Sequence, residues 1–279
     1  MSGVVEEPPG AAAEVPLGRR IAVVLIPIYV LVLMSFVLPE IALDSSFAEL
    51  VVRLTDSSTW QQLPLLCAAG VIVLVSRPGL SARRRAVEGV VVFVAMGLGL
   101  AGVAQFNEHV LKPAVHAPRP NIVTLADAGA LGPEVPDADA FYELGDKDVR
   151  RELLREQLPE LDEPALAPLV REHWIEETGY TFPSGHATAS MTFATMMLAL
   201  GLCWLGGWRQ RITTALPVWA LCVAYSRPLL RVHRPLDVSV GALVGMGLGL
   251  LCFVVIRWLV ERITDEGARA TESVTGAPS

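Results

Sequence analysis

The sequence predicts an all-α membrane protein, and three observations lead to that prediction. Hydrophobic residues make up 52% of the 279 residues and charged residues only 18%, which is too apolar for an ordinary soluble protein. Six apolar runs reach or approach the roughly 20 residues that a membrane-crossing helix needs. One large hydrophilic segment, residues 121–180, separates the third run from the fourth. We therefore expect a bundle of membrane helices that carries a polar insert.

The apolar runs follow one another as successive membrane helices would. They cover residues 21–38, 60–76, 87–111, 187–205, 212–225 and 236–260. The second and fifth runs are short, so hydropathy alone leaves open that they are re-entrant segments. Small residues about four apart let membrane helices approach closely. We therefore predict helix packing, and not nucleotide binding, for the glycines inside the third and sixth runs, Gly97, Gly99, Gly102, Gly241, Gly245, Gly247 and Gly249.

Arginines predict how the bundle is oriented, because basic residues concentrate in cytoplasmic loops. They occur before the first run, in the loops after the second and fourth runs, and around the end of the sixth: Arg19, Arg20, Arg77, Arg83, Arg84, Arg85, Arg209, Arg211, Arg257 and Arg262. Both termini are therefore expected in the cytoplasm and the insert outside. We expect residues 19–262 to form the membrane core, and residues 1–18 and 263–279 to be disordered cytoplasmic tails.

The insert is dense in Asp and Glu and makes the whole chain acidic, with a net charge of −7. We predict a small helical domain on the extracytoplasmic surface. One helix is expected over residues 148–158, with Asp148 as its cap and Pro159 as its stop, and a second over about 164–177. No EF-hand spacing is present, so a solvated acidic face is favoured over a calcium site.

Strongly polar residues next to the apolar runs gather in three segments, the first of which covers residues 112–120. Lys112 and Arg119 bracket a proline-rich turn where the third helix is expected to leave the bilayer. Basic residues on the outer side are unusual for such a topology. Contact with lipid headgroups is one reading, but the concentration of cations favours an anion-binding site.

The second polar segment is Pro183-Ser184-Gly185-His186, at the start of the fourth helix. Pro is favoured in the first turn of a helix, Ser is a preferred cap, and Gly allows close approach to a ligand. Free N–H groups at a helix N-terminus bind anions. Taken alone, these four residues are compatible with an ordinary helix cap.

The third polar segment runs from Ser226-Arg227 to Asp237. Arg227 offers a fork of donors suited to phosphate oxygens. His233 and Asp237 are four residues apart, with Pro235 at the expected first turn of the last helix, so Asp237 can reach back to the imidazole. A histidine held by a carboxylate can act as a nucleophile. A first-turn Asp that only stabilises the helix start is the alternative.

The three segments together resemble the signature of the type 2 phosphatidic acid phosphatase (PAP2) superfamily. That signature reads Lys, six residues, Arg-Pro; then Pro-Ser-Gly-His; then Ser-Arg, five residues, His, three residues, Asp. The resemblance implies that all six runs span the membrane and that the site is extracytoplasmic and needs no metal or other cofactor. It implies His233 as nucleophile, Asp237 as its partner and His186 as general acid and then base. Phosphate would be bound by Lys112, Arg119, Ser184, Gly185 and Arg227.

The expected function is therefore that of a multi-pass cell-membrane phosphatase. Its substrates would be phosphatidic acid, phosphatidylglycerol phosphate or a polyprenyl diphosphate, cleaved through a phosphohistidine. The partners expected are the phosphorylated lipid and the bilayer, and no nucleic acid. A phosphotransferase with an alcohol or second lipid as acceptor is the main alternative, and a non-enzymatic binder of lipid phosphate is another. A vanadium-dependent haloperoxidase, a class of protein with a similar anion pocket, is disfavoured because those proteins are soluble.

Overall fold

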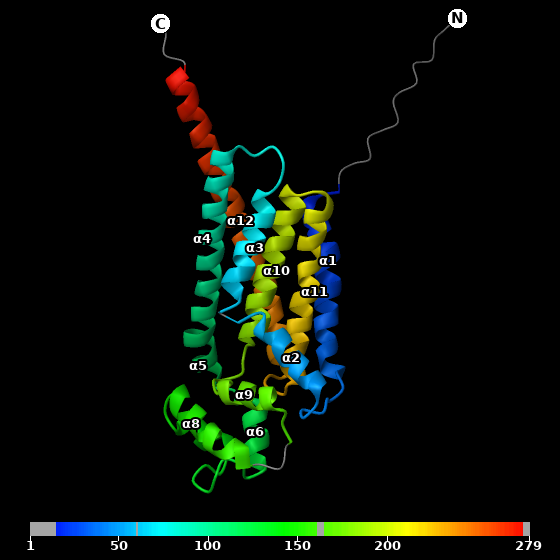
Figure 1. Ribbon diagram of the computed structural model, residues 1–279, viewed down its shortest axis with the longest axis vertical. Helices are drawn as coiled ribbons and strands as arrows, with labels where there is room; N and C mark the ends of the chain where they lie inside the picture. Colours follow the sequence, from blue (N-terminus) through cyan, green and yellow to red (C-terminus); the bar gives the residue numbers. More distant parts are fainter. Residues whose placement is uncertain (1–14, 60, 161–164, 276–279) are drawn as a thin grey trace, which may run out of the picture.

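The computed structural model describes residues 15–59, 61–160 and 165–275, with side chains up to residue 263 apart from that of residue 160. Every regular element in these ranges is a helix, and no strand occurs within them (Figure 1). The all-α prediction is therefore confirmed for this part of the chain. Residues 1–14, most of the expected N-terminal tail, lie outside the described residues.

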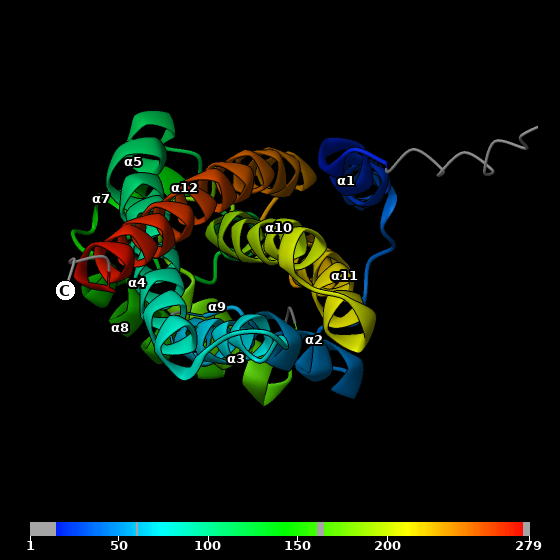
Figure 2. The same cartoon turned by 90° about the horizontal axis from the view of Figure 1, so that it is seen from above.

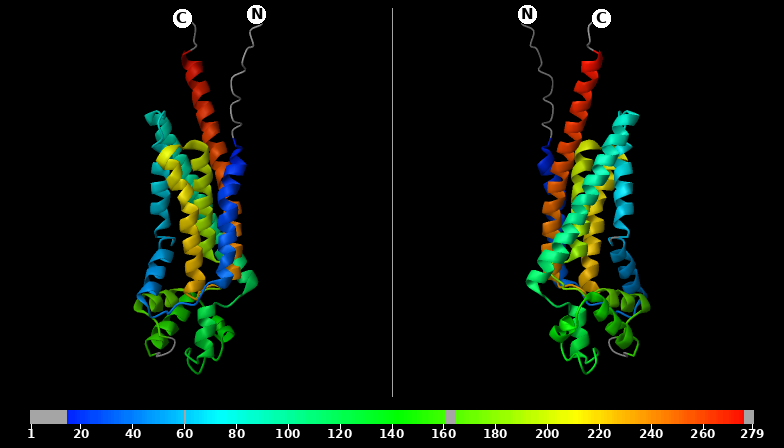
Figure 3. Two further views of the ribbon diagram at one scale, coloured as in Figure 1. Left: turned by 90° about the vertical axis from the view of Figure 1, so that its right-hand side faces the viewer. Right: turned by 90° about the vertical axis from the view of Figure 1, so that its left-hand side faces the viewer.

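Long helices form an elongated bundle, and all of them run roughly along its long axis (Figures 1 and 3). They are α1 Leu17–Leu33, α3 Leu63–Val75, α4 Ala82–Phe106, α10 Gly185–Trp204, α11 Gly207–Leu229 and α12 Pro235–Thr275. Each one corresponds to one of the six apolar runs, in the same order. Apolar composition together with start signals, such as Pro235 at the first position of α12, explains this agreement.

Helix α10 occupies the centre of the bundle (Figure 2). It contacts α12, α11, α4, α1 and α3, and nearly all of its residues from Ala187 to Gly201 are buried. The helix carries no charged side chain after its first turn. A helix that is apolar on all sides is expected to be buried in this way. The second polar segment, which opens α10, is therefore held on the central element of the fold.

Within the described residues, four helical stretches are long and apolar enough to cross a membrane. They are Leu17–Val37, Ala82–Val115, Gly185–Trp204 and Pro235–Ile263. Apolar side chains on their outer faces, such as Val23, Leu98 and Leu251, are exposed, as a lipid-facing surface requires. Helix α3 is apolar but has only 13 residues, and α11 begins and ends with polar residues. These two helices correspond to the second and fifth apolar runs, residues 60–76 and 212–225, which are the short ones in the sequence.

Glycines bring α12 against α10, as predicted, at three of the four positions on that helix. A Cβ atom added at Gly241, Gly245 or Gly249 would come within 2.5–2.8 Å of a backbone oxygen of residues 184–192. Gly99 of α4 is similarly close to the sulfur of Cys252. The prediction is wrong for Gly97, Gly102 and Gly247, which face open space, because these glycines lie on the outward faces of their helices.

The insert forms a separate layer at one end of the bundle, opposite the start of α1 and the end of α12 (Figures 1 and 3). Its helices are α6 Pro120–Asp127, α7 Ala138–Glu143, α8 Lys147–Gln157, a 3-10 turn Leu158–Glu160, and α9 Pro168–Glu176. Helix α2, Ser46–Asp56, packs against α9. Phe141, Leu154 and Trp174 are buried in a second hydrophobic cluster, which the insert shares with α2 and with the loop before α12. The insert is therefore a small folded unit.

Several expected boundaries differ from the structure. Asp146, and not Asp148, caps α8, because its side chain accepts hydrogen bonds from two backbone N–H groups at the start of that helix. The second insert helix begins at Pro168, four residues later than expected, and α6 and α7 were not predicted. Helix α12 continues to Thr275, so residues 263–275 are helical where a disordered tail was expected. No proline interrupts that stretch.

Candidate active site

All eight candidate residues come together at the end of the bundle that faces the insert. Lys112 opens the short helix α5 (Lys112–Val115), Arg119 precedes α6, Ser184, Gly185 and His186 start α10, Arg227 is in the last turn of α11, His233 lies in the loop before α12, and Asp237 is in the first turn of α12. A backbone hydrogen bond of 3.0 Å from Ser184 N to Asp237 O joins the start of α10 to the start of α12. The second and third polar segments are therefore directly linked.

Five of the candidates line one cavity of about 320 Å³. These five are Lys112, Arg119, Gly185, His186 and His233. Its wall also contains apolar residues of α3 and α4, which are Leu63, Leu100, Val103 and Ala104, and further polar residues such as Asn107 and Glu177. The other three candidates, Ser184, Arg227 and Asp237, are buried and do not border the cavity. A cavity with cations and histidines on one side and aliphatic side chains on the other suits a ligand with an anionic and a hydrocarbon part.

His233 is held by bonds to both of its ring nitrogens. Arg119 Nη1 lies 3.1 Å from Nε2, and the hydroxyl oxygen of Thr181 lies 2.9 Å from Nδ1. Burial, together with the nearby Arg119 and Arg227 guanidiniums, holds the pKa of His233 well below its ordinary value of 6.5. The imidazole is therefore neutral at neutral pH, which is the form that a nucleophile needs.

Asp237 does not bond His233 directly, contrary to the sequence prediction. Its Oδ2 lies 3.8 Å from His233 Nδ1, which is beyond hydrogen-bond distance. The same oxygen accepts bonds from the Thr181 hydroxyl at 2.6 Å and from Arg234 N at 2.7 Å. The Thr181 hydroxyl lies between the carboxylate and the ring, so the contact between the two predicted partners is indirect.

Glu177, which the sequence reasoning missed, lies between the two candidate arginines. Its Oε2 is 2.7 Å from Arg119 Nη2, and its Oε1 pairs with Arg227 Nη2. The same Oε1 is 3.9 Å from His186 Nδ1. Burial alone would raise the pKa of Glu177, but Arg119 and Arg227 together hold it well below 4.5. The residue is thus a carboxylate anion within the group of cations.

Arg227 is fully buried and bonded on several sides. Its Nη1 donates to Thr55 Oγ1 at 2.9 Å and lies 3.1 Å from His173 Nε2. Its Nε is buried without a hydrogen-bond partner among the described residues. Since arginine can only donate, His173 must accept at Nε2, and burial next to Arg227 lowers the pKa of His173 to about 3. Helices α2 and α9 thus hold the fork of Arg227 in place.

Lys112 and the start of α10 complete the site. Lys112 pairs with Glu108 Oε2 at 2.8 Å. Glu108 lies one helical turn before Lys112, in the segment Asn107–Leu111 that precedes α5, and this ion pair holds the Lys112 ammonium in place. Ser184 caps α10 as predicted, its Oγ accepting from Ala187 N at 3.4 Å. A Cβ on Gly185 would lie 3.3 Å from Asn107 Nδ2, so a larger residue there would crowd the cavity wall.

Comparison with known proteins identifies the family of the chain. A family model described as the PAP2 superfamily matches residues 89–261, more than half of the chain and a range that contains all eight candidates. The chain belongs to the PAP2 superfamily. Phosphatidylglycerophosphatase B of Escherichia coli K12 is 37% identical over 154 residues, which are 55% of this chain and 54% of that protein. The protein of the same name from Haemophilus influenzae is 30% identical over 170 residues, 58% of this chain and 66% of that protein.

This PAP2-superfamily chain thus matches about half the length of the first of those relatives. Residues 89–261, the range that the family model matches, also contain the site residues that the signature does not include. Glu177 and Thr181 come from the segment between α9 and α10, and His173 comes from α9. In the sequence they cannot be distinguished from the surrounding acidic and polar residues of the insert. For Glu177 and Thr181, the only signal in the sequence is that they lie six residues or fewer before the second polar segment.

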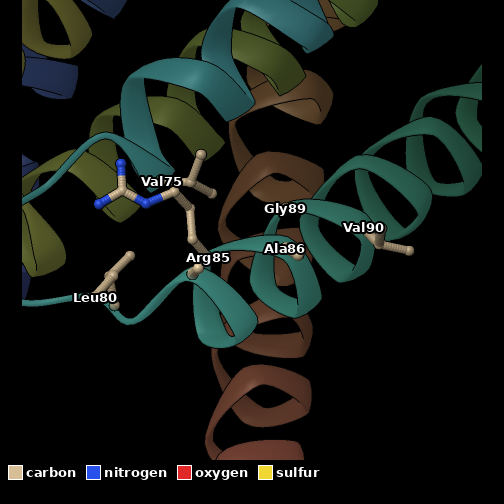
Figure 4. Close-up of a pocket in the computed structure, with 7 residues that line it drawn as sticks. Val75, Leu80, Arg85, Ala86, Gly89 and Val90 are labelled. Carbon is tan, nitrogen blue, oxygen red and sulfur yellow. The ribbon is translucent and has the colours of Figure 1, made fainter.

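Of two further cavities, one adjoins the PAP2 site and the other is remote from it. One of about 710 Å³ shares Glu108, Glu177 and His186 with the candidate site and opens among α2, α8 and α9. The site therefore has a polar side toward the insert as well as its apolar side. The other, of about 630 Å³, lies at the opposite end of the bundle between the end of α3 and the start of α4, around Arg85 and Gly89 (Figure 4). It contains none of the candidate residues.

Proposed function

We propose that this protein is an integral membrane phosphatase that hydrolyses lipid phosphate monoesters or diphosphates. The observation that carries the proposal is the position of His233. It lines a cavity together with Lys112, Arg119 and His186, and aliphatic residues of α3 and α4 form part of the same wall. A nucleophile, a proton donor and fixed cations are the groups that metal-independent phosphoryl transfer requires.

The reaction would proceed in two steps. In the absence of a ligand, burial and the Arg227 guanidinium hold the pKa of His186 well below 6.5, so His186 would take up its proton when the phosphate dianion binds beside it. Nε2 of His233 attacks phosphorus, the bond from phosphorus to the leaving oxygen breaks, and the protonated His186 gives that oxygen its proton. A water molecule then attacks the phosphohistidine while His186 takes a proton from it. The phosphorus–nitrogen bond breaks, and inorganic phosphate and a neutral His233 result. Lys112, Arg119 and Arg227 offset the negative charge of the transferring phosphoryl group.

Glu177 has a defined role in this proposal. The substrate phosphate would take over the two guanidiniums that Glu177 now holds, since a dianion competes well with a carboxylate for a pair of arginines. The displaced carboxylate would remain next to His186, from which it is 3.9 Å away. Gly185, which lines the cavity, would supply a backbone N–H group at the start of α10. The N–H of Ser184 is bonded to Asp237 O, so Ser184 would hold this helix start in place and would not bind phosphate through its backbone.

For the substrate we propose a phosphorylated lipid of the phosphatidylglycerol phosphate class first, and phosphatidic acid or a polyprenyl diphosphate next. The relatives from Escherichia coli and Haemophilus influenzae bear a name that specifies phosphatidylglycerol phosphate. The apolar wall of α3 and α4 supports entry of a lipid from the side of the bundle. Inorganic phosphate would leave through the polar cavity toward the insert.

We further propose six membrane spans in the core 19–262, with the insert 121–180 outside the cell and both termini inside. The loops with Arg77, Arg83 and Arg209 lie at the end away from the insert (Figures 1 and 3), which supports this orientation. A membrane-impermeant maleimide should label Asp148→Cys in intact cells and Arg83→Cys only after lysis. The reverse pattern would overturn the topology.

The activity is tested by phosphate release from these lipids in detergent micelles that contain a metal chelator. We expect turnover by the wild type and none by His233→Ala. His116→Ala is the matched control, because His116 is exposed and lies outside the cavity. Activity that needs an added divalent metal, or that survives His233→Ala, would contradict the proposal. Transfer of phosphate to an added alcohol, with little free phosphate, would favour the phosphotransferase.

A further inference from the structure

Thr181 links the proposed nucleophile, His233, to its predicted partner, Asp237. It is fully buried in the segment between α9 and α10. Its hydroxyl oxygen lies 2.9 Å from His233 Nδ1 and 2.6 Å from Asp237 Oδ2. The direct distance from His233 Nδ1 to Asp237 Oδ2 is 3.8 Å. The only hydrogen-bonded path from the carboxylate to the ring among the described residues therefore passes through Thr181.

The directions of the two hydrogen bonds of the Thr181 hydroxyl follow from which groups can donate and which can only accept. An ionised carboxylate can only accept, and a threonine hydroxyl has a single proton. That proton must therefore point to Asp237, which leaves the hydroxyl oxygen to accept from an N–H at His233 Nδ1. With the proton on Nδ1, the neutral ring carries its lone pair on Nε2. Nε2, the unprotonated nitrogen, is then the nucleophilic one.

A second, independent contact requires the same tautomer. Arg119 Nη1 lies 3.1 Å from His233 Nε2, and a guanidinium can donate but not accept. Nε2 must therefore be the acceptor nitrogen. The contacts of Arg119 with Nε2 and of Thr181 with Nδ1 thus both place the proton of the neutral ring on Nδ1.

The hydroxyl is also held in place by its surroundings. The backbone N–H of Thr181 donates to Ala117 O at 3.0 Å, which joins this segment to the turn before Arg119. Asp237 is fixed from the other side by the 2.7 Å bond from Arg234 N. The arrangement needs no movement of Thr181 or Asp237 before His233 can react.

We propose that Thr181 is a positioning residue for the reaction: its hydroxyl connects the Asp237 carboxylate to His233 and selects the tautomer in which Nε2 carries the lone pair, which attacks once Arg119 turns from Nε2 to the phosphate. This inference rests on the proposed function of His233. During the attack the ring becomes a phosphorylated cation that keeps its proton on Nδ1. The bond through Thr181 to the Asp237 carboxylate then stabilises that positive charge.

The test compares Thr181→Val, which has the same shape without the hydroxyl, with Thr181→Ser, which keeps the hydroxyl. In phosphate release from phosphatidic acid micelles, kcat of the valine variant should fall about 10- to 100-fold, the effect of losing one functional hydrogen bond. KM should change less than about threefold, and the serine variant should stay within about threefold of wild type. Serine as impaired as valine, or valine as active as wild type, would overturn the inference.

A double-mutant cycle separates transmission from simple packing. If Thr181 acts through Asp237, Thr181→Val should lower kcat hardly any further in an Asp237→Asn background, whereas additive losses would contradict the inference.

If Thr181→Val does not fold, Thr181→Ala and Thr181→Ser differ by one oxygen and allow the same decision. His233→Ala in the same assay distinguishes failure of the inference on Thr181 from failure of the proposed phosphatase function. Its inactivity beside a fully active Thr181→Val would refute the role of Thr181 and leave the phosphatase proposal standing.

Discussion

Glu177 and Arg119 form an ion pair inside the candidate site, with 2.7 Å between Oε2 and Nη2. The other carboxylate oxygen pairs with Arg227. One internal anion therefore joins the two guanidiniums, which come from different polar segments. In the absence of a ligand this pairing satisfies cations that would otherwise repel each other in a buried setting. A phosphate that binds here has to compete with Glu177.

Neutralising Glu177 should therefore strengthen the binding of phosphate. In Glu177→Gln the two guanidiniums lose their internal counter-ion, so we expect inorganic phosphate to inhibit with a Ki that is about 5- to 50-fold lower. The control is Glu176→Gln, since Glu176 is an exposed neighbour that pairs with Arg151 and Arg155. An unchanged or higher Ki in Glu177→Gln would show that the carboxylate does not compete with phosphate.

Arg227 should not be replaceable by lysine. Its guanidinium contacts Thr55, His173 and Glu177 at once, and a single ammonium cannot reproduce that fork. We expect Arg227→Lys to lower kcat/KM at least about 100-fold. Arg231→Lys is the matched control, because Arg231 is partly exposed and pairs with Glu40. Near-wild-type kcat/KM in Arg227→Lys would refute the assignment of the fork to phosphate.

The glycines of α12 predict a contrast between two positions two residues apart. A Cβ at Gly245 would lie 2.5 Å from Thr188 O, whereas nothing lies within 4 Å of a Cβ at Gly247. Gly245→Ala should therefore force α12 away from α10 and cost about 1–3 kcal/mol of unfolding free energy. Gly247→Ala should be neutral or slightly stabilising. Thermal unfolding in detergent measures both, and equal melting temperatures would contradict this packing.

His173 predicts a dependence of stability on pH. Its pKa is lowered to about 3 in the folded protein, by burial first and by Arg227 next, although Glu177 opposes the shift. In the unfolded chain it titrates near 6.5. Between these values the unfolded state binds the extra proton, so stability is lost as the pH falls from about 6.5 toward 3.

Replacing His173 by Gln should flatten part of that dependence, because the amide keeps an acceptor for Arg227 but does not titrate. The measurement is the melting temperature at several pH values between 7 and 4. The control is His116→Gln, since His116 is exposed, and its curve should follow the wild type. A slope in His173→Gln as steep as that of the wild type would mean that His173 does not stay neutral in the folded state.

Sequence reasoning succeeded where the local pattern determines the structure. Apolar runs became the long helices, Ser184 caps α10, and Pro235 opens α12. The positions of Lys112, Arg119, His186 and His233 around one cavity also followed, because each is tied to the end of a helix.

The parts that failed depend on contacts between distant segments. Glu177, Thr181 and His173 belong to an acidic insert whose residues look alike in sequence, and only the packing of α9 against the bundle selects them. The expected bond from Asp237 to His233 failed for the same reason. A spacing of four residues brings the two side chains close, but it does not reveal that the Thr181 hydroxyl occupies the space between them.

The central claim is that His233 carries the phosphoryl group, and trapping that intermediate tests it most directly. The protein is mixed with a lipid labelled in its phosphate, quenched in alkali within the first turnover, and analysed for protein-bound label. We predict label that is stable to alkali and released by mild acid, as expected of a phosphohistidine, present in the wild type and His116→Ala and absent from His233→Ala. Label that persists in His233→Ala, or that resists acid, would contradict the account.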